Sequence, residues 1–292
     1  MIKRDKLRKE KLSEYNEAKI RVSLYRPYVK QYLYFDYIPI DLKGQDEEIF
    51  PSAKAENQAI WIKSGSDWKF LALGINVLST YLPQGGSTTL PLHRYTEDGS
   101  RVENITDWAL GQFQKHYKDK QITKEDIFYY VYGVLHSPEY REQYAADLKK
   151  VLPRIPYAPD FKAFSQAGRK LADLHLNYET VEPWPVQEDA KPKGDLNDLA
   201  YYRVEKMRFA SLGGRNKDKS VIVFNSRITL RGIPLQAYDY VVNGKSAIEW
   251  VMERYQVSTD KDSGIKDDPN DWCREHDDPA YILNLVKRVI RV

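Results

Sequence analysis

The spacing of apolar side chains changes along the chain near Asp107. Before this residue, short runs such as Ala59–Lys63 and Trp68–Leu73 are separated by Gly, Ser and Asp, which predicts strands joined by a turn at Ser64–Asp67. After it, helix signals begin, including Thr123 three residues before Asp126, an N-cap pattern. The sequence therefore predicts an α+β protein with a β-rich N-terminal lobe, a helical middle, and a second mixed lobe that ends in helices.

Four segments are expected: a connector helix over residues 1–24, a β-rich lobe over 25–120, a helical segment over 121–180, and a mixed lobe over 181–292. The same pattern is also consistent with one continuous domain. Within these segments, Arg26-Pro27 is expected to open an extended stretch to residue 40, and Val221–Asn225 to form a buried strand. Helices are expected from Ser137-Pro138 through Leu148, and over residues 160–178, 246–256 and 279–292.

Bulk composition fits a soluble globular protein, with 292 residues, 42% hydrophobic and 30% charged. The single cysteine, Cys273, excludes an intramolecular disulfide and is typical of a reducing compartment. The sequence has no apolar run long enough for a transmembrane helix and no signal-peptide pattern, so a cytoplasmic location and no membrane partner are expected. The 22 tyrosines suit either cores or interaction surfaces.

No motif in the sequence is equipped for catalysis or for a resident metal. Residues 213–220 nearly match a phosphate-binding loop, but Asp218 replaces its second glycine and a strand, rather than a helix, is expected to follow. The aspartates of residues 260–271 miss the calcium-loop spacing, because glycine falls fifth instead of sixth. We therefore expect no catalytic residue, no metal site and no cofactor in this chain.

Charge is segregated near the C-terminus. Residues 203–231 carry eight basic and two acidic side chains, whereas residues 259–279 carry eight acidic and three basic ones. A basic segment with a Gly-Gly loop is suited to following a phosphate backbone, while its arginines reach base edges. The alternative is that these charges solvate a sheet edge. The best DNA-binding candidates are four loop residues and two strand residues: Arg215, Asn216, Lys217, Lys219, Arg227 and Arg231.

Further candidates lie elsewhere in the chain. Lys245 and Ser246 precede a helix whose start suits a phosphate. Ser246 and Glu249 also form the pattern of a capping box, which explains the same residues without a ligand. Weaker candidates are Arg26 and Lys30, which alternatively pack at a domain junction, and Ser87 and Thr88, which alternatively belong to a plain surface turn.

Several longer stretches resemble one known family. They are Tyr25–Asp36, Ile122–Tyr140, Leu152–Tyr157, Leu171–Tyr178 and Tyr240–Trp272, the last with the core Asn-Gly-Lys-Ser-Ala-Ile-Glu-Trp. These motifs and their order along the chain resemble the C-terminal specificity region of the type ISP restriction–modification enzymes. These stretches are spread over nearly the whole chain, so the resemblance covers most of it.

The resemblance implies recognition of a short asymmetric double-stranded DNA site. In that bacterial family one polypeptide carries a nuclease, an ATP-dependent translocase, an N6-adenine methyltransferase and then this region. The parent enzyme would use S-adenosylmethionine, ATP and Mg, and the methyltransferase domain would be this chain's partner. The chain is then expected to be an excised fragment. Two alternatives remain: a lobe that docks on the methyltransferase with little base readout, and a residual nuclease that uses the aspartates of residues 260–278.

Overall fold

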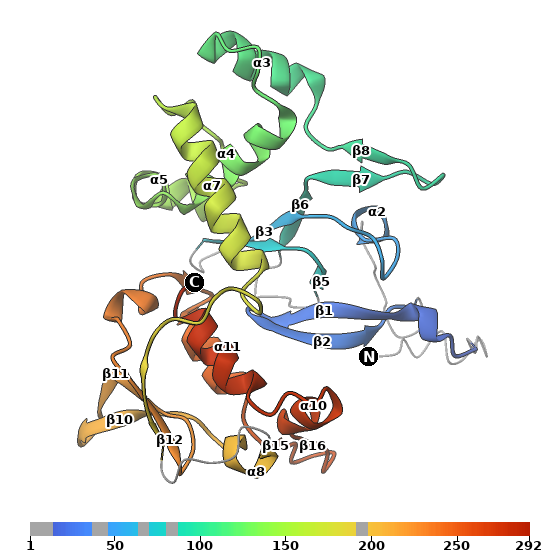
Figure 1. Cartoon of the computed structure of the whole chain (residues 1–292). Helices are drawn as coiled ribbons and strands as arrows, with labels where there is room; N and C mark the ends of the chain where they lie inside the picture. The colour runs from blue at the N-terminus through green and yellow to red at the C-terminus, as the bar shows by residue number, and fades with distance from the viewer. Residues whose placement is uncertain (1–13, 37–45, 64–69, 80–86, 191–197) are drawn as a thin grey trace. The chain divides into compact units, whose positions relative to one another are not determined.

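The structure is a computed structural model that describes residues 14–36, 46–63, 70–79, 87–190 and 198–292. These residues form two compact units (Figure 1). Unit 1 contains the described residues up to Arg26 and from Lys30 to Leu176, and unit 2 contains Pro27–Val29 and Asn177–Val292. Both units combine helices with small sheets, which confirms the α+β class. No described helix is both long and apolar enough to cross a membrane.

The N-terminal strands form three small sheets. They are β1 (Ile20–Arg26), β2 (Val29–Tyr34), β3 (Ala59–Lys63), β4 (Leu71–Ile75), β5 (Leu78–Ser79), β6 (Thr88–Pro91), β7 (His93–Tyr95) and β8 (Arg101–Glu103). Strand β3 lies between β4 and β6 in antiparallel order, and every residue of β3 and β4 is buried. The predicted pairing of these two runs is confirmed, while its turn at Ser64–Asp67 lies outside the described residues.

The prediction for the N-terminal segment was wrong in two places. Residues 20–24 belong to strand β1 instead of a connector helix, and the first 13 residues of that helix lie outside the described part. Pro27 does not open a strand, because it sits in the turn between β1 and β2, where Tyr28 has a positive φ of 60°. The β-branched residues Ile20 and Val22 favour a strand here, and local charge alone did not reveal it.

The remaining elements of unit 1 are helical. They are η1 (Glu17–Lys19), α2 (Asp46–Ile49), α3 (Asp107–Tyr117), α4 (Lys124–His136), α5 (Pro138–Gln143), α6 (Ala145–Leu148) and α7 (Phe161–Leu176). The predicted capping box of Thr123 and Asp126 opens α4, and Ser137 caps α5 with Pro138 in its first turn. The helix expected from Pro138 to Leu148 is divided at Tyr144.

Helices α4 and α7 pack against each other at very short range (Figure 1). A Cβ atom at Gly168 of α7 would lie 1.9 Å from the carbonyl oxygen of Tyr129 in α4, so no larger residue fits there. Tyr132 of α4 accepts a hydrogen bond from the amide of Gly74 in β4 at 2.7 Å. These contacts join the helices to the sheet in a single core.

Unit 2 is built around one four-stranded sheet in the order β10-β11-β12-β9. Its strands are β9 (Gln187–Ala190), β10 (Arg208–Gly213), β11 (Asn216–Val223) and β12 (Ile228–Arg231), with short pairs β13 (Val241–Val242) and β14 (Lys245–Ser246), and β15 (Ser258–Thr259) and β16 (Lys266–Asp267). Its helices are α8 (Leu199–Tyr202), η2 (Leu235–Tyr238), α9 (Ala247–Arg254), α10 (Asn270–Glu275) and α11 (Tyr281–Val289). Helix α11 buries one apolar side, including Ile282, Leu285 and Val286, in the core of this unit.

Candidate nucleic-acid interface

The basic segment of the sequence folds into the β10–β11 hairpin, at one edge of the main sheet of unit 2. The sequence predicted a loop over residues 213–220 followed by a strand. This boundary was wrong, because Asn216–Val223 is one strand, and Asn216, Lys217 and Lys219 all lie on it. The loop is reduced to Gly214 and Arg215, between the paired residues Gly213 and Asn216. Glycine is suited to this tight connection because Gly214 has a positive φ of 58°.

The tip of the hairpin is exposed and positively charged. Arg215, Asn216 and Lys217 are all exposed. Within the part of the chain that the structure describes, their side chains make no hydrogen bond or ion pair. The structure thus brings these three predicted residues together on one projecting turn, where they are available to a partner.

A bulge in β11 interrupts the strand pairing near the base of the β10–β11 hairpin. Phe209 pairs with Ile222, but the next residue, Ala210, pairs with Asp218, so three residues of β11 have no partner on β10. Asp218 Oδ1 accepts hydrogen bonds from Ser220 N at 2.9 Å and Ser220 Oγ at 2.5 Å. These hydrogen bonds from Ser220 hold the pKa of Asp218 below its ordinary value. Such bulges bend a strand, so the tip points in a different direction from the base.

The side chain of Lys219 contacts Glu249 and Tyr238, and these contacts stabilise the bend. Its Nζ donates to Glu249 Oε1 at 2.8 Å and lies 4.8 Å from the centre of the Tyr238 ring. The Tyr238 hydroxyl in turn donates to the carbonyl oxygen of Lys219 at 2.7 Å. Lys219 is therefore placed as a fixed support of the hairpin.

Glu249 also closes the capping box that the sequence predicted. Its Oε2 accepts from Ser246 N at 3.0 Å, while Ser246 Oγ accepts from Glu249 N. Burial opposes ionisation of Glu249, but the hydrogen bonds from Lys219 and Ser246 outweigh it and hold the pKa of Glu249 below its usual value. Ser246 is 0% exposed, so its side chain serves the helix cap and is not accessible to a phosphate.

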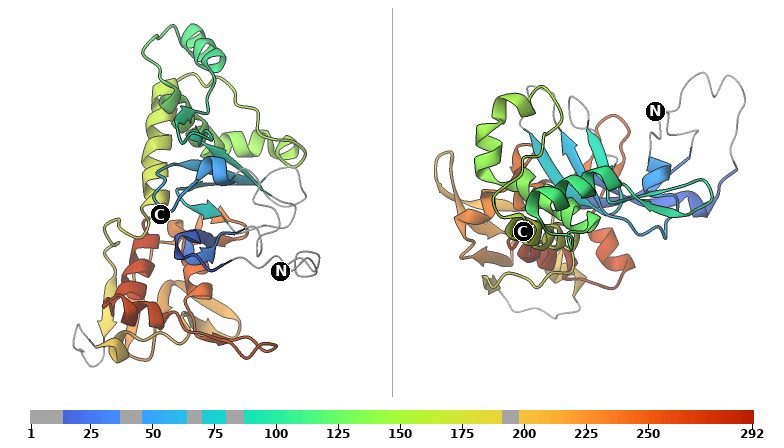
Figure 2. Two further views of the ribbon diagram at one scale, coloured as in Figure 1. Left: turned by 90° about the vertical axis from the view of Figure 1, so that its right-hand side faces the viewer. Right: turned by 90° about the horizontal axis from the view of Figure 1, so that it is seen from above.

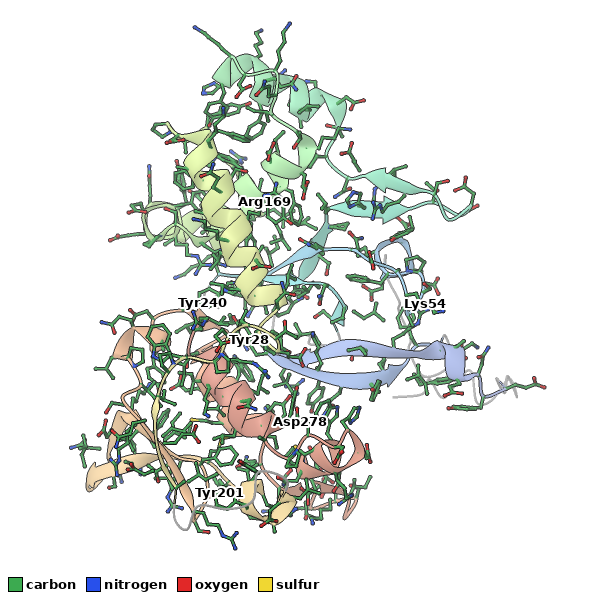
Figure 3. The ribbon with its side chains drawn as sticks, in the orientation of Figure 1. Tyr28, Lys54, Arg169, Tyr201, Tyr240 and Asp278 are labelled. Atoms are coloured by element: carbon green, nitrogen blue, oxygen red, sulfur yellow. The ribbon has the colours of Figure 1, made fainter. Side chains whose placement is uncertain are left out.

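The other strong candidates differ in whether they already form an ion pair with an acidic side chain. Arg231 pairs with Asp189 at 2.5 Å, and Lys245 pairs with Glu253. Arg227 is exposed, and its Cζ lies 5.8 Å from the ring centre of Tyr201, which Figure 3 labels. Arg227 thus remains available, whereas Arg231 and Lys245 already have acidic partners.

One exposed cation beside the hairpin was absent from the predicted site. Arg208 opposes Val223 at the start of β10, and it is exposed without a hydrogen bond or ion pair to any described residue. It belongs to the basic segment that the sequence singled out, but its strand register was needed to place it on the open face of the sheet.

Of the eight basic residues between Arg203 and Arg231, three form ion pairs with described acids, namely Arg203, Lys219 and Arg231. The other five have no such pair within the described ranges: Lys206, Arg208, Arg215, Lys217 and Arg227. A sheet edge that used lysines only for solvation would not need the exposed, unpaired Arg215 and Lys217 at the hairpin tip. This arrangement favours an anionic partner for the hairpin.

The weaker candidates lie apart in the chain. Arg26 donates to the Tyr25 carbonyl at 2.7 Å and stacks over the Tyr25 ring, which agrees with a packing role, and Lys30 is half-buried on β2. Ser87 is half-buried, and Thr88 is exposed at the start of β6. None of these four residues joins the β10–β11 hairpin, which belongs to unit 2.

The acidic segment folds into the β15–β16 hairpin and α10. Asp260 Oδ1 accepts from the amides of Asp262 and Ser263, and Asp268 pairs with Arg203 at 2.8 Å. Asp260 thus holds the turn of this hairpin, whereas Asp268 forms an ion pair with a distant residue. Among the described residues, no group of three or more His, Cys, Asp or Glu side chains is arranged to hold a metal.

Unit 1 has a separate polar cavity of about 370 Å³ between the β7 region and the segment before β3. Its lining includes Asn57, Gln58 and His93. Asn57 is already fixed, because it donates to the carbonyl oxygens of Ile49 and His93. No predicted binding residue lines this cavity.

Comparison with known proteins identifies one family. A family model of the type ISP C-terminal specificity domain matches residues 2–285. No curated protein gives a significant match. The ATP-dependent type ISP restriction–modification enzyme LlaBIII bound to DNA is similar over 98% of this chain and 19% of its own, with 33% identity and a TM-score of 0.85.

Two further solved structures agree. A nuclease-deletion mutant of the type ISP restriction–modification enzyme LlaGI, in complex with a DNA substrate mimic, has 38% identity and a TM-score of 0.80 over 98% of this chain and 25% of its own. The DrdV–DNA complex has 34% identity and a TM-score of 0.84 over 98% of this chain and 28% of its own. The chain therefore spans less than a third of the length of each of these structures.

Proposed function

This chain belongs to the type ISP C-terminal specificity domain family, and we propose that it recognises a short asymmetric double-stranded DNA site for a restriction–modification enzyme. The resemblance found in the sequence is confirmed by the family match over residues 2–285. The three similar structures are all complexes with DNA or a DNA mimic, which supports DNA as the ligand.

The observation that carries the proposal is the exposed tip of the β10–β11 hairpin with its unpaired Arg215 and Lys217. A two-stranded β-ribbon fits the major groove of B-DNA. In that position lysines and arginines neutralise phosphates, and an arginine that reaches guanine O6 and N7 discriminates that base by about 1–3 kcal/mol. Asn216, at the same tip, is suited to adenine N6 and N7.

The chemistry of the parent enzyme is proposed to lie outside this chain. Nuclease, ATP-dependent translocase and N6-adenine methyltransferase activities, with S-adenosylmethionine, ATP and Mg, would belong to the rest of a longer polypeptide. The methyltransferase part would hold the other side of the duplex and flip the target adenine out of the stack. The present chain would contribute the choice of site and would bind none of these cofactors.

Selection from a random duplex library tests this function. The full 292-residue chain is incubated with the library at physiological salt, the bound pool is sequenced, and the affinity is repeated over a salt series. We expect one enriched asymmetric site. Arg215→Ala should change the preference at one base position, and Lys217→Ala should weaken all sequences alike. Lys261→Ala, which removes an exposed lysine from the β15–β16 hairpin, is the matched control.

The alternatives give different results. If the affinity falls steeply with salt but no site is enriched, this chain binds phosphates, and base readout requires the complete enzyme. Tight binding to the methyltransferase portion without any DNA preference would favour the docking role instead. An unchanged preference in both Arg215→Ala and Arg208→Ala would reject the hairpin as the reading surface, and an unchanged preference in Arg227→Ala would reject the neighbouring β11–β12 connection.

A further inference from the structure

Leu212 is an exposed apolar residue on the most cationic turn of unit 2. Its side chain is 67% exposed, and it lies between Ser211 and Gly213 near the end of β10. Ser211 pairs with Lys217, and Gly213 pairs with Asn216, so Leu212 is an additional residue without a partner on β11. A bulge of this kind redirects one side chain out of the regular alternation of a strand.

The tip carries Leu212 clear of the rest of unit 2. A Cβ atom added at Gly213 or at Gly214 would meet no heavy atom within 4 Å, so open space surrounds the turn. An isolated exposed leucine needs no explanation by itself. What distinguishes Leu212 is its setting, because residues 208–217 contain three basic side chains and no acidic one.

A second exposed aliphatic residue in unit 2 shows the contrast. Ile265 is 68% exposed beside β16, but aspartates surround it in sequence, at positions 260, 262, 267 and 268. An acidic setting repels DNA, whereas the cationic setting of Leu212 attracts it. The partner of Leu212 must therefore combine negative charge with a small apolar feature.

We propose that Leu212 recognises the 5-methyl group of a thymine in the major groove. This inference rests on the proposed DNA-reading function and names one base feature that the hairpin reads. Among the four bases, only thymine presents a methyl group at the major-groove edge, and apolar side chains contact it there. A phosphate contact from Lys217 and the base contact proposed for Arg215 would hold the turn in the groove, while the bulge directs Leu212 to the base edge.

The test replaces each thymine of the selected site, one at a time, by deoxyuridine, which lacks only the methyl group. Binding of the full chain is measured by fluorescence anisotropy. The wild-type chain should lose about fourfold in affinity at one position, the effect of one buried methyl group. Leu212→Ala should bind the thymine duplex more weakly and should bind the thymine and deoxyuridine duplexes equally.

Two additional variants keep the result specific. Ile265→Ala removes an equally exposed aliphatic side chain from the acidic hairpin, and it should retain the full deoxyuridine penalty. Leu212→Gln keeps the length of the side chain but adds a polar end, and it should lose the penalty as Leu212→Ala does. Because Leu212 is exposed, both of its variants should keep the wild-type melting temperature.

The possible outcomes distinguish a failure of the Leu212 inference from a failure of the proposed DNA recognition. If the wild-type chain enriches a site but tolerates deoxyuridine at every position, or if that site contains no thymine, the role of Leu212 is overturned while DNA recognition stands. A penalty that persists in Leu212→Ala overturns it as well. If the wild-type chain enriches no site, the proposed DNA readout by this chain has failed, and the methyl inference fails with it.

Discussion

The β10–β11 and β15–β16 hairpins of unit 2 share several local features and are opposite in charge. In each hairpin an aspartate accepts hydrogen bonds from residues just after it, a glycine has positive φ, and an aliphatic side chain is exposed. The left-hand view of Figure 2 shows the β15–β16 hairpin extending away from the rest of its unit. Their strands differ in length, with six and eight residues in β10 and β11 but two each in β15 and β16.

Charge distinguishes their roles. The β10–β11 hairpin carries four basic side chains and one acid, Asp218, whereas Lys261 of the other hairpin lies between Asp260 and Asp262. The acidic hairpin is also tied inward at its base, because Asp268 pairs with Arg203 and Lys266. We infer that only the first hairpin is suited to DNA, and the following predictions test that difference.

Charge reversal should give the largest effect. The double variant Arg215→Glu/Lys217→Glu places repulsive charge at the proposed base contact of Arg215 and the proposed phosphate contact of Lys217, so DNA affinity at physiological salt should fall on the order of 100-fold. Lys261→Glu reverses one charge on the acidic hairpin and should leave affinity unchanged. Anisotropy titrations at several salt concentrations measure both. Equal losses in the two variants would show that total charge, and not the β10–β11 tip, determines binding.

The turn glycines should give the next effect. Gly214 has φ of 58° and Gly264 has φ of 70°, and an L-residue in this region costs roughly 1–2 kcal/mol. Gly214→Ala and Gly264→Ala should therefore destabilise their hairpins by similar amounts in urea unfolding or hydrogen exchange. Only Gly214→Ala should also weaken DNA binding. A loss of binding in Gly264→Ala would mean that the acidic hairpin takes part in recognition.

The two hairpins also show which features a sequence reveals. Local signals were sufficient for the capping boxes at Thr123 and Ser246, which depend on residues three positions apart. They failed for residues 216–220, because Asn216 and Asp218 favour turns, whereas their pairing with Gly213 and Ala210 of β10 places them in a strand. Turn composition was therefore a poor guide to where β11 begins.

The candidate site was predictable only as a region. The basic excess over residues 203–231 correctly located a surface with unpaired cations. Which of these charges are already paired could not be predicted, because Lys219 meets Glu249 and Arg231 meets Asp189, at separations of 30 and 42 residues. The sequence did not single out Arg208, because its position opposite Val223 depends on the register of the sheet.

Lys219, which supports the hairpin proposed to read DNA, should have a smaller effect than the residues of its tip. Lys219→Met removes the ion pair with Glu249 but keeps an apolar side chain beside Tyr238. Because Lys219 is placed as a positioning residue, selectivity between the preferred site and a single-base variant should fall about threefold, the scale of one partly exposed ion pair. The salt dependence should stay at its wild-type slope, whereas a direct phosphate contact would lower the slope by about one.

The smallest expected effect is the response of each hairpin to acid. It depends on Asp218, which holds the bulge of the first hairpin, and on Asp260, which holds the turn of the second. Hydrogen bonds from Ser220 lower the pKa of Asp218, and those from Ser263 lower the pKa of Asp260. A carboxyl whose folded pKa is depressed contributes stability above its unfolded pKa, about 3.9, and that contribution is lost as the pH falls through the folded value. The β10–β11 hairpin should thus loosen at its bulge, and the β15–β16 hairpin at its turn, as the solution is acidified below about pH 4.

Amide chemical shifts and hydrogen exchange of Ser220 and Ser263, followed from pH 5 to pH 2, measure this loosening. Asp218→Asn keeps an oxygen that accepts the same hydrogen bonds but does not titrate, so the acid response should vanish at Ser220 and persist at Ser263. Asp260→Asn should give the reverse. If either substitution abolished both responses, the two turns would be coupled, and the separation between a DNA-reading hairpin and an acidic one would no longer hold.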